Sequence, residues 1–184
     1  MKANELKPGM AIKINNDLWV IIRTEHVKPG KGPAYVQVKV KSVAVGNVVE
    51  RRLRSVEDVE HAQLDRRDME YLYSDNTGHV FMDQNSYEQL AISNDLIGEQ
   101  MPFVKPNTVV NVMLHEGRPL SVELPSSVDL RVIETTPQVK GATATNQLKE
   151  ATLETGLKTR VPPFIEIGET VRINTADGSY LSRS

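Results

Sequence analysis

The chain has 184 residues, 39% of them hydrophobic, with no cysteine and a formal net charge of −2. This length fits two or three small domains as well as one large domain, and the lack of cysteine excludes disulfides and Cys-ligated zinc or iron–sulfur sites. No apolar run approaches the ~20 residues that cross a bilayer, and the N-terminus lacks the apolar core of a signal peptide, so we expect a cytoplasmic protein with no membrane partner.

Residues 1–64 have the pattern of a small β-barrel. From Tyr35 to Lys41 the sequence alternates strictly, which places three valines on one face and two lysines on the other. The first 45 residues hold eight Lys or Arg and three Asp or Glu, an excess that fits either a solvated surface or a basic face that meets phosphates. The strands predicted in this segment are 11–14, 18–23, 35–41 and 43–49.

Residues 65–127 contain a second set of strand patterns. This part of the chain is acidic, with nine acidic and four basic residues between positions 66 and 128. Its helical signal is at 87–90, where Asn85 or Ser86 provides a cap. We predict strands at 69–74, 79–83, 109–114 and 120–124.

Residues 128–184 form the third unit, in which basic and acidic residues balance at seven each from position 129 onward. A polar stretch from Thr135 to Thr145 separates its first strand from the others. The predicted strands are 130–134, 157–161, 164–167, 170–174 and 180–182. Short strands separated by turns, with almost no helix, predict an all-β protein in which two five-stranded OB-type barrels follow the N-terminal barrel.

Motifs of enzymes are absent from the sequence. It contains no G-x-S-x-G, no H-E-x-x-H and no phosphate-binding loop, and its four histidines are scattered. Asp65 and Asp68 could be read as paired carboxylates, but a charged linker between two barrels explains them at least as well. We therefore predict no catalytic residue, no metal site and no enzymatic activity.

The unusual local feature is the segment 26–35, in which Lys31 lies between two glycines and two prolines. Glycine frees the backbone and proline restrains it, so this loop is expected to project one long cationic side chain. Taken alone, the segment is better explained by a hairpin whose lysines keep a strand edge soluble, and the residues around it favour a second explanation. The other explanation is a basic patch with an aromatic group that meets RNA. Its members are His26, Lys28, Lys31, Tyr35 and Lys39.

Three separated segments carry a family resemblance. The first is residues 26–35, His-Val-Lys-Pro-Gly-Lys-Gly-Pro-Ala-Tyr. The second is residues 149–168, which have the pattern K-x-A, then G, then V-P-x-x-I-x-x-G. The third is residues 177–183, Asp-Gly-Ser-Tyr-Leu-Ser-Arg. In this order they resemble the domain I hairpin, the C-terminal signature and the last strand of the bacterial elongation factor P family. Thr159 and the loop 141–147 depart from the family pattern.

The resemblance implies an SH3-like (KOW-like) barrel at 1–64, OB-fold barrels at 65–127 and 128–184, and an L-shaped, tRNA-like arrangement. It implies a monomer that binds the 70S ribosome between the P and E sites, positions the CCA end of the P-site peptidyl or initiator tRNA, and relieves stalling at consecutive prolines. Lys31 would be the functional tip. It would also be the candidate for covalent modification, by β-lysylation or another amine addition, by a dedicated enzyme, with no other cofactor. The alternative is an unmodified Lys31, because Pro33 directly after Gly32 also resembles a subset of the family in which a rigid Pro-Gly-Lys-Gly-Pro loop serves with an unmodified lysine.

The same resemblance, with the charge pattern, gives a set of candidate tRNA and rRNA contacts. They are His26, Lys28, Pro29, Gly30, Lys31, Gly32, Tyr35, Lys39, Tyr180 and Arg183. The last two are open to a second explanation, because a terminal Arg beside an aromatic ring is often simply solvated.

Two other functions remain as alternatives, and the first of them shares this architecture. One is an elongation factor P-like paralogue that rescues different stall motifs, and Lys31 favours the standard factor over it. The other is a generic OB-fold RNA-binding protein. Only 5% of the chain is aromatic, which is few residues for the stacking platforms of such proteins.

Overall fold

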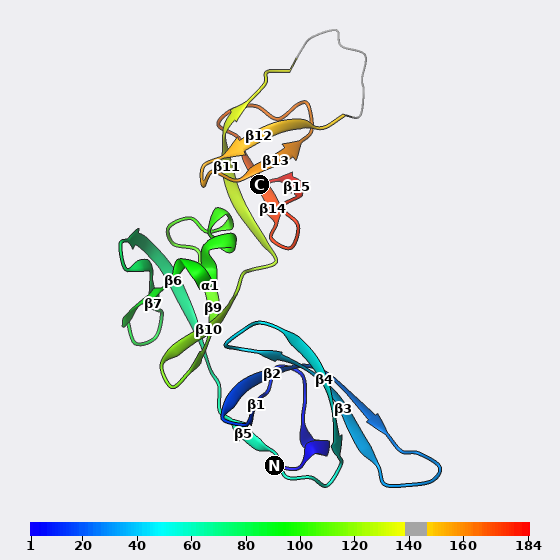
Figure 1. Cartoon of the computed structure of the whole chain (residues 1–184). Coiled ribbons are helices and arrows are strands. Elements are labelled where there is room, and N and C mark those ends of the chain that lie inside the picture. The colour runs from blue at the N-terminus through cyan, green and yellow to red at the C-terminus, as the bar shows by residue number, and fades with distance from the viewer. Residues whose placement is uncertain (139–146) are drawn as a thin grey trace. The chain divides into compact units, whose positions relative to one another are not determined.

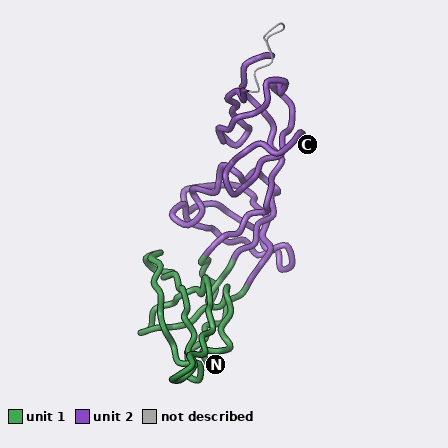
Figure 2. Tube along the Cα trace, turned by 90° about the vertical axis from the view of Figure 1, so that its right-hand side faces the viewer, with its two compact units in different colours: residues 1–65, 113–120 green, residues 66–112, 121–184 purple. Residues whose placement is uncertain are grey.

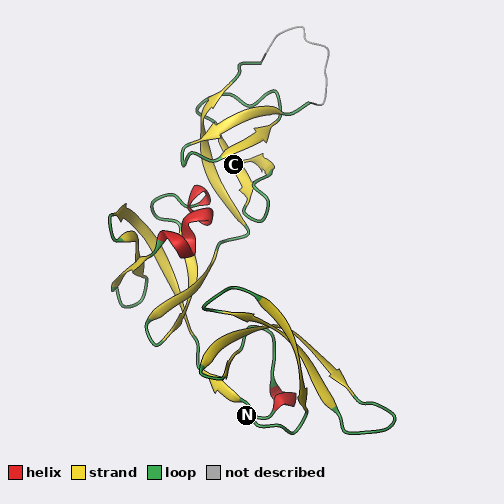
Figure 3. Ribbon diagram, in the orientation of Figure 1, coloured by secondary structure: helices red, strands yellow, loops and turns green. Residues whose placement is uncertain are grey.

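The computed structural model describes residues 1–138 and 147–184. These residues form three five-stranded sheets with only short helical segments, so the predicted all-β class is confirmed (Figures 1 and 3). The chain separates into two compact units, residues 1–65 with 113–120 and residues 66–112 with 121–184 (Figure 2). Apart from Gln147, the predicted loop 141–147 lies outside the described residues.

The first sheet has the strand order β4-β3-β2-β1-β5. Its elements are η1 Ala3–Glu5, β1 Ala11–Ile14, β2 Asp17–Val27, β3 Tyr35–Ser42, β4 Val48–Arg54 and β5 Glu60–Ala62. Val36, Val38 and Val40 are fully buried, which confirms the face predicted from the alternation of β3. They pack with Leu6 and Ile21 into the core of this sheet.

The predicted strand 43–49 is wrong. Residues 43–47 form a turn in which Gly46 N donates to Ser42 O at 2.9 Å and Gly46 has φ +82°. Val45 is 80% exposed, so this apolar run does not enter the core. The strand instead begins at Val48 and ends at Arg54, because Val49 and Leu53 are the apolar side chains that pack on the core.

The second sheet has the order β10-β9-β6-β7-β8. Its elements are β6 Asp65–Asp75, β7 Gly78–Asp83, β8 Gln89–Ile92, α1 Asn94–Ile97, η2 Gly98–Phe103, β9 Val109–His115 and β10 Arg118–Glu123. Phe81 is fully buried, and its ring centroid lies 5.3 Å from that of Tyr71. The residues 65–68, predicted as a linker, are instead the first residues of β6.

The predicted helix at 87–90 is also wrong. The carboxylate of Asp83 accepts hydrogen bonds from the backbone N–H groups of Asn85 (2.7 Å) and Ser86 (3.1 Å), which stabilises a turn and holds the pKa of Asp83 below its ordinary value. Tyr87 then adopts φ +62°, a value that ends any helix. Residues 89–92 pair with β7 as strand β8.

The third sheet has the order β13-β12-β11-β14-β15. Its strands are β11 Ser127–Thr135, β12 Lys149–Leu153, β13 Lys158–Val161, β14 Thr170–Asn174 and β15 Tyr180–Arg183. Strand β12 was not predicted from the sequence, and the strand predicted at 164–167 is wrong. That segment is a turn region that buries Ile165 while Phe164 and Ile167 remain exposed, and it is closed by Gly168 at φ +93°.

Candidate nucleic-acid interface

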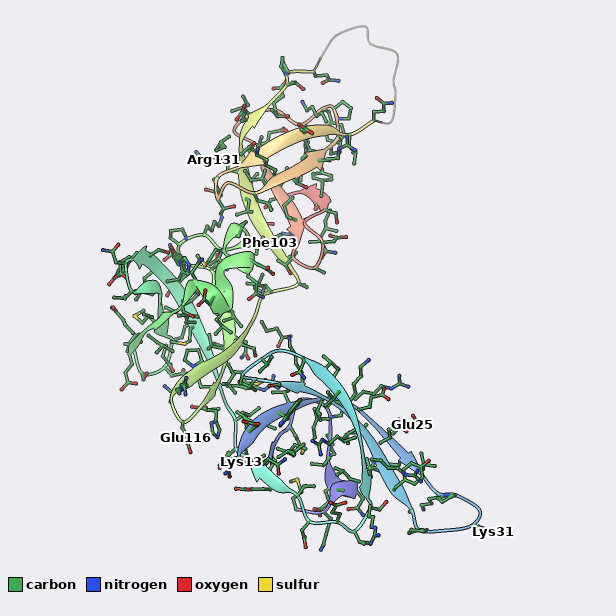
Figure 4. The ribbon with its side chains drawn as sticks, in the orientation of Figure 1. Lys13, Glu25, Lys31, Phe103, Glu116 and Arg131 are labelled. Atoms are coloured by element: carbon green, nitrogen blue, oxygen red, sulfur yellow. The ribbon has the colours of Figure 1, made fainter. Side chains whose placement is uncertain are left out.

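The hairpin of β2 and β3 forms an arm that carries Lys31 at its end (Figure 4). Strand pairing runs from Trp19 opposite Ser42 to Val27 opposite Tyr35, and the loop 28–34 closes the arm beyond the last pair. Among the described residues, no carboxylate lies within ion-pair distance of the Lys31 ammonium, which is exposed. The lysine is therefore available to a partner.

The two glycines beside Lys31 have different roles. Gly32 has φ +106°, in a region that side chains other than that of glycine rarely adopt, whereas Gly30 has no such requirement. A Cβ added to either residue would have no heavy atom of the described residues within 4 Å. The tip is thus surrounded by open space, and its shape depends on Gly32 and not on Gly30.

The strand register divides the predicted RNA contacts between the two faces of the arm. A β-bulge between Ile21 and Arg23 shifts the alternation of β2 by one residue. As a result His26 lies opposite the buried Val36, on the inner face of the sheet. Tyr35 and Lys39 lie on the outer face, so the structure does not bring His26 together with them. Lys28 and Pro29 belong to the loop.

Strand β4 adds arginines to the outer face that were not predicted from the sequence. Tyr35 lies opposite Arg54, and the guanidinium carbon of Arg52 lies 3.6 Å from the centroid of the Tyr35 ring. Glu50 lies opposite Lys39 and accepts a hydrogen bond from Gln37 at 3.2 Å, which reduces the positive charge around Lys39. The available signal was the pair of apolar residues Val49 and Leu53 within a run of charged residues, and it was missed because the strand was predicted too early in the chain.

At the C-terminus, Arg183 and Tyr180 are both engaged within their own sheet. The Arg183 guanidinium lies 4.6 Å from the Phe164 ring centroid and 3.2 Å from the Glu169 carboxylate. Tyr180 is half-buried against the core of the third sheet. These contacts give both side chains a structural role. They leave the predicted RNA contact of this pair without support from the geometry.

Family models match three consecutive parts of the chain. They are the elongation factor P KOW-like domain at residues 2–59, the elongation factor P OB domain at 64–122 and the elongation factor P C-terminal domain at 128–183. The chain belongs to the elongation factor P family. The predicted family is thereby confirmed, and the chain is a translation elongation factor of this family.

Known proteins agree with this assignment. Elongation factor P from two strains of Acidithiobacillus ferrooxidans is 45% identical over 184 residues, which is 100% of this chain and 99% of each relative. The solved structure of eukaryotic translation initiation factor 5A from Methanococcus jannaschii matches with a TM-score of 0.53 and 24% identity, covering 66% of this chain and 92% of that one. The match to this solved structure shows a similar fold and nothing more.

Two other kinds of site have requirements that the side chains and helices of residues 1–138 and 147–184 do not meet. No group of three or more His, Asp or Glu residues in this part of the elongation factor could hold a metal ion. None of its helices is long and apolar enough to cross a membrane.

Proposed function

We propose that this elongation factor, which acts with the ribosome, binds between the P and E sites and accelerates peptide-bond formation at consecutive prolines. The observation that carries the proposal is Lys31, an exposed cation at the end of a two-stranded arm, with open space around it. Such a side chain suits contact with the CCA end of the P-site tRNA. The protein performs no bond chemistry in this mechanism, since the ribosome supplies the reacting groups.

Catalysis in this mechanism is entropic. Holding the CCA end in one reactive geometry removes translational and rotational freedom before the incoming amine attacks. Proline substrates gain most from this help, because the pyrrolidine ring fixes φ and restricts both the nascent chain and the attacking nitrogen. Lys31 acts as a positioning cation and neither removes a proton nor attacks a carbonyl.

The basic arm supports binding as well as positioning. Lys28 is exposed in the loop and Lys39 on the outer face of β3, where each can neutralise a phosphate of tRNA or rRNA. Released counterions then contribute to affinity, so binding should weaken as salt rises. We propose that the factor binds through these contacts as a cytoplasmic monomer.

Modification of Lys31 belongs to the same proposal. An added amine-bearing chain, such as β-lysine, would lengthen the reach of the tip and keep its positive charge, and a dedicated enzyme would attach it. Since Lys31 is exposed and Gly30 and Gly32 flank it, a modifying enzyme has access to the ammonium. Intact-mass and peptide mass spectrometry on protein from its native host tests this, with an unmodified Lys31 as the result that contradicts it.

The function itself is tested with purified ribosomes. Tripeptide synthesis is measured on a triproline template and on a matched triphenylalanine template, each with and without the protein. We expect acceleration on the triproline template and little change on the other. Equal acceleration of both templates would favour a general RNA-binding protein, and rescue of a different stalling template alone would favour the paralogue.

A further inference from the structure

A hollow lies beside the tip of the arm, between the loop 28–34 and the outer face of strands β3 and β4. Its lining includes Lys31, Pro33, Tyr35, Arg52, Arg54 and Glu57. Three of these side chains are cationic and one is acidic, so the hollow has an excess of positive charge. The role proposed for Lys31 does not use the arginines.

The Tyr35 ring orients one of these cations. Arg52 holds its guanidinium carbon 3.6 Å from the ring centroid, a distance typical of a cation–π contact. In such a stack the flat face of the guanidinium is covered and its N–H groups point outward from the edge. Arg52 is therefore pre-organised as a fork of donors, which reduces the entropy lost when it binds an anion.

Within residues 1–138 and 147–184, both arginines lack an acidic partner. In the described part of the chain no carboxylate lies within ion-pair distance of the guanidinium of Arg52 or Arg54. Glu57, the acidic residue of the lining, accepts a hydrogen bond from the backbone N–H of Arg54 at 3.0 Å. One of its carboxylate oxygens is thus already used by the turn that follows β4. The two exposed guanidiniums retain their capacity for an external anion.

We propose that this hollow binds a backbone phosphate of the RNA strand whose 3′ end Lys31 contacts, with Arg52 and Arg54 as the donors. The inference rests on the proposed function and adds a phosphodiester subsite to it. Guanidinium forks match the geometry of phosphate oxygens in a bidentate manner. RNA is favoured over an acidic protein segment because the hollow adjoins the side chain proposed to meet the tRNA end.

Salt dependence of binding tests the subsite. The affinity of the full chain for 70S ribosomes with P-site tRNA is measured over a series of salt concentrations. We expect Arg52→Ala to bind roughly tenfold more weakly at low salt. Its slope of log K against log salt should be smaller by about one, which is the signature of one lost phosphate contact.

Arg51→Ala is the matched control. Arg51 is exposed on the same strand and carries the same charge, but it lies opposite Val38 on the other face of the sheet. Its removal should change neither the slope nor the affinity appreciably. Equal slopes for Arg51→Ala and Arg52→Ala would overturn the subsite, and the triproline assay would still decide the proposed function separately.

Two further variants separate geometry from charge. Arg52→Lys keeps the charge but not the fork, and Tyr35→Ala removes the stacking ring without changing any charge. Both should weaken binding at constant salt and leave the slope unchanged, whereas wild-type affinity in both would refute the role of the stack. The fluorescence of Trp19, the single tryptophan of the chain, checks that each variant keeps the N-terminal sheet folded.

A tethered probe identifies the occupant. Because the chain has no cysteine, Gln37→Cys places a single thiol on the outer face, directly opposite Arg52. An iron chelate attached there cleaves nearby RNA backbone by hydroxyl radicals. Cleavage within the acceptor strand of P-site tRNA is the expected result. Its absence, with cuts only in a neighbouring ribosomal protein, would contradict the RNA assignment.

Discussion

The conformation of Gly32 gives a quantitative prediction for the tip of the arm. With φ at +106°, an alanine there is strained by roughly 1–2 kcal/mol, and no clash adds to this because no atom of the residues that the structure describes lies within 4 Å of the new Cβ. Gly30 has neither the strained φ nor a close neighbour, so Gly30→Ala should stay within about 0.5 kcal/mol of wild type. The two glycines therefore form a matched pair on either side of Lys31.

The assay has a stability arm and a functional arm. Urea unfolding followed by Trp19 fluorescence reports the first sheet, and triproline synthesis at saturating protein reports the tip. We expect the free energy of unfolding of Gly32→Ala to fall by no more than the strain energy, because an exposed loop can change shape. The rate of triproline synthesis should fall strongly, because the new loop conformation redirects Lys31. If Gly32→Ala kept wild-type stability and rate, or if Gly30→Ala were the defective variant, the assigned tip geometry would be wrong.

Three further predictions concern the other sheets and the basic arm. Gly78→Ala should destabilise the second sheet by about 3 kcal/mol, since the new Cβ would lie 2.5 Å from Ile92 O at φ +137°; hydrogen exchange of the β7 and β8 amides measures this. Because the folded-state pKa of Asp83 is lowered, its carboxylate stabilises the fold above the ordinary pKa of about 3.9, and this contribution is lost as pH falls through the lowered value. As the pH falls below 4, the urea midpoint of Asp83→Asn should therefore decrease less than that of the wild type. An equal decrease in both proteins would contradict this. Lys28→Glu should weaken ribosome binding more than Lys39→Glu, because a glutamate already lies opposite Lys39; the reverse order in a filter-binding assay would count against the face assignment.

Local patterns predicted the strands whose two faces differ clearly. The alternation of residues 35–41 identified β3 and its buried valines, because one face packs on a core and the other meets water. The helix expected at 87–90 failed for a tertiary reason. Asp83, 4% exposed, fixes a turn there and the following residues pair with β7, so the strand partner overrode the local cap signal.

The candidate site was predicted at its tip and missed at its base. The Pro and Gly residues on both sides of Lys31 predicted a loop that projects this lysine, and in the structure Lys31 is exposed in the loop at the end of the arm. The contribution of Arg52 required the pairing of β3 with β4, a long-range register that no local pattern contains. The bulge in β2 likewise moved His26 to the inner face, which sequence periodicity alone could not reveal.

The most direct test of the proposed mechanism is the rate of triproline synthesis with Lys31→Ala at saturating protein, compared with Lys28→Ala. Lys31 is exposed, so its truncation should change stability by no more than about 0.5 kcal/mol. Contact with the reacting CCA end is made as the groups align, and its loss lowers rate more than affinity. We predict that Lys31→Ala loses the rescue while Lys28→Ala regains it at saturation. Triproline synthesis by Lys31→Ala at the wild-type rate would contradict the proposed mechanism.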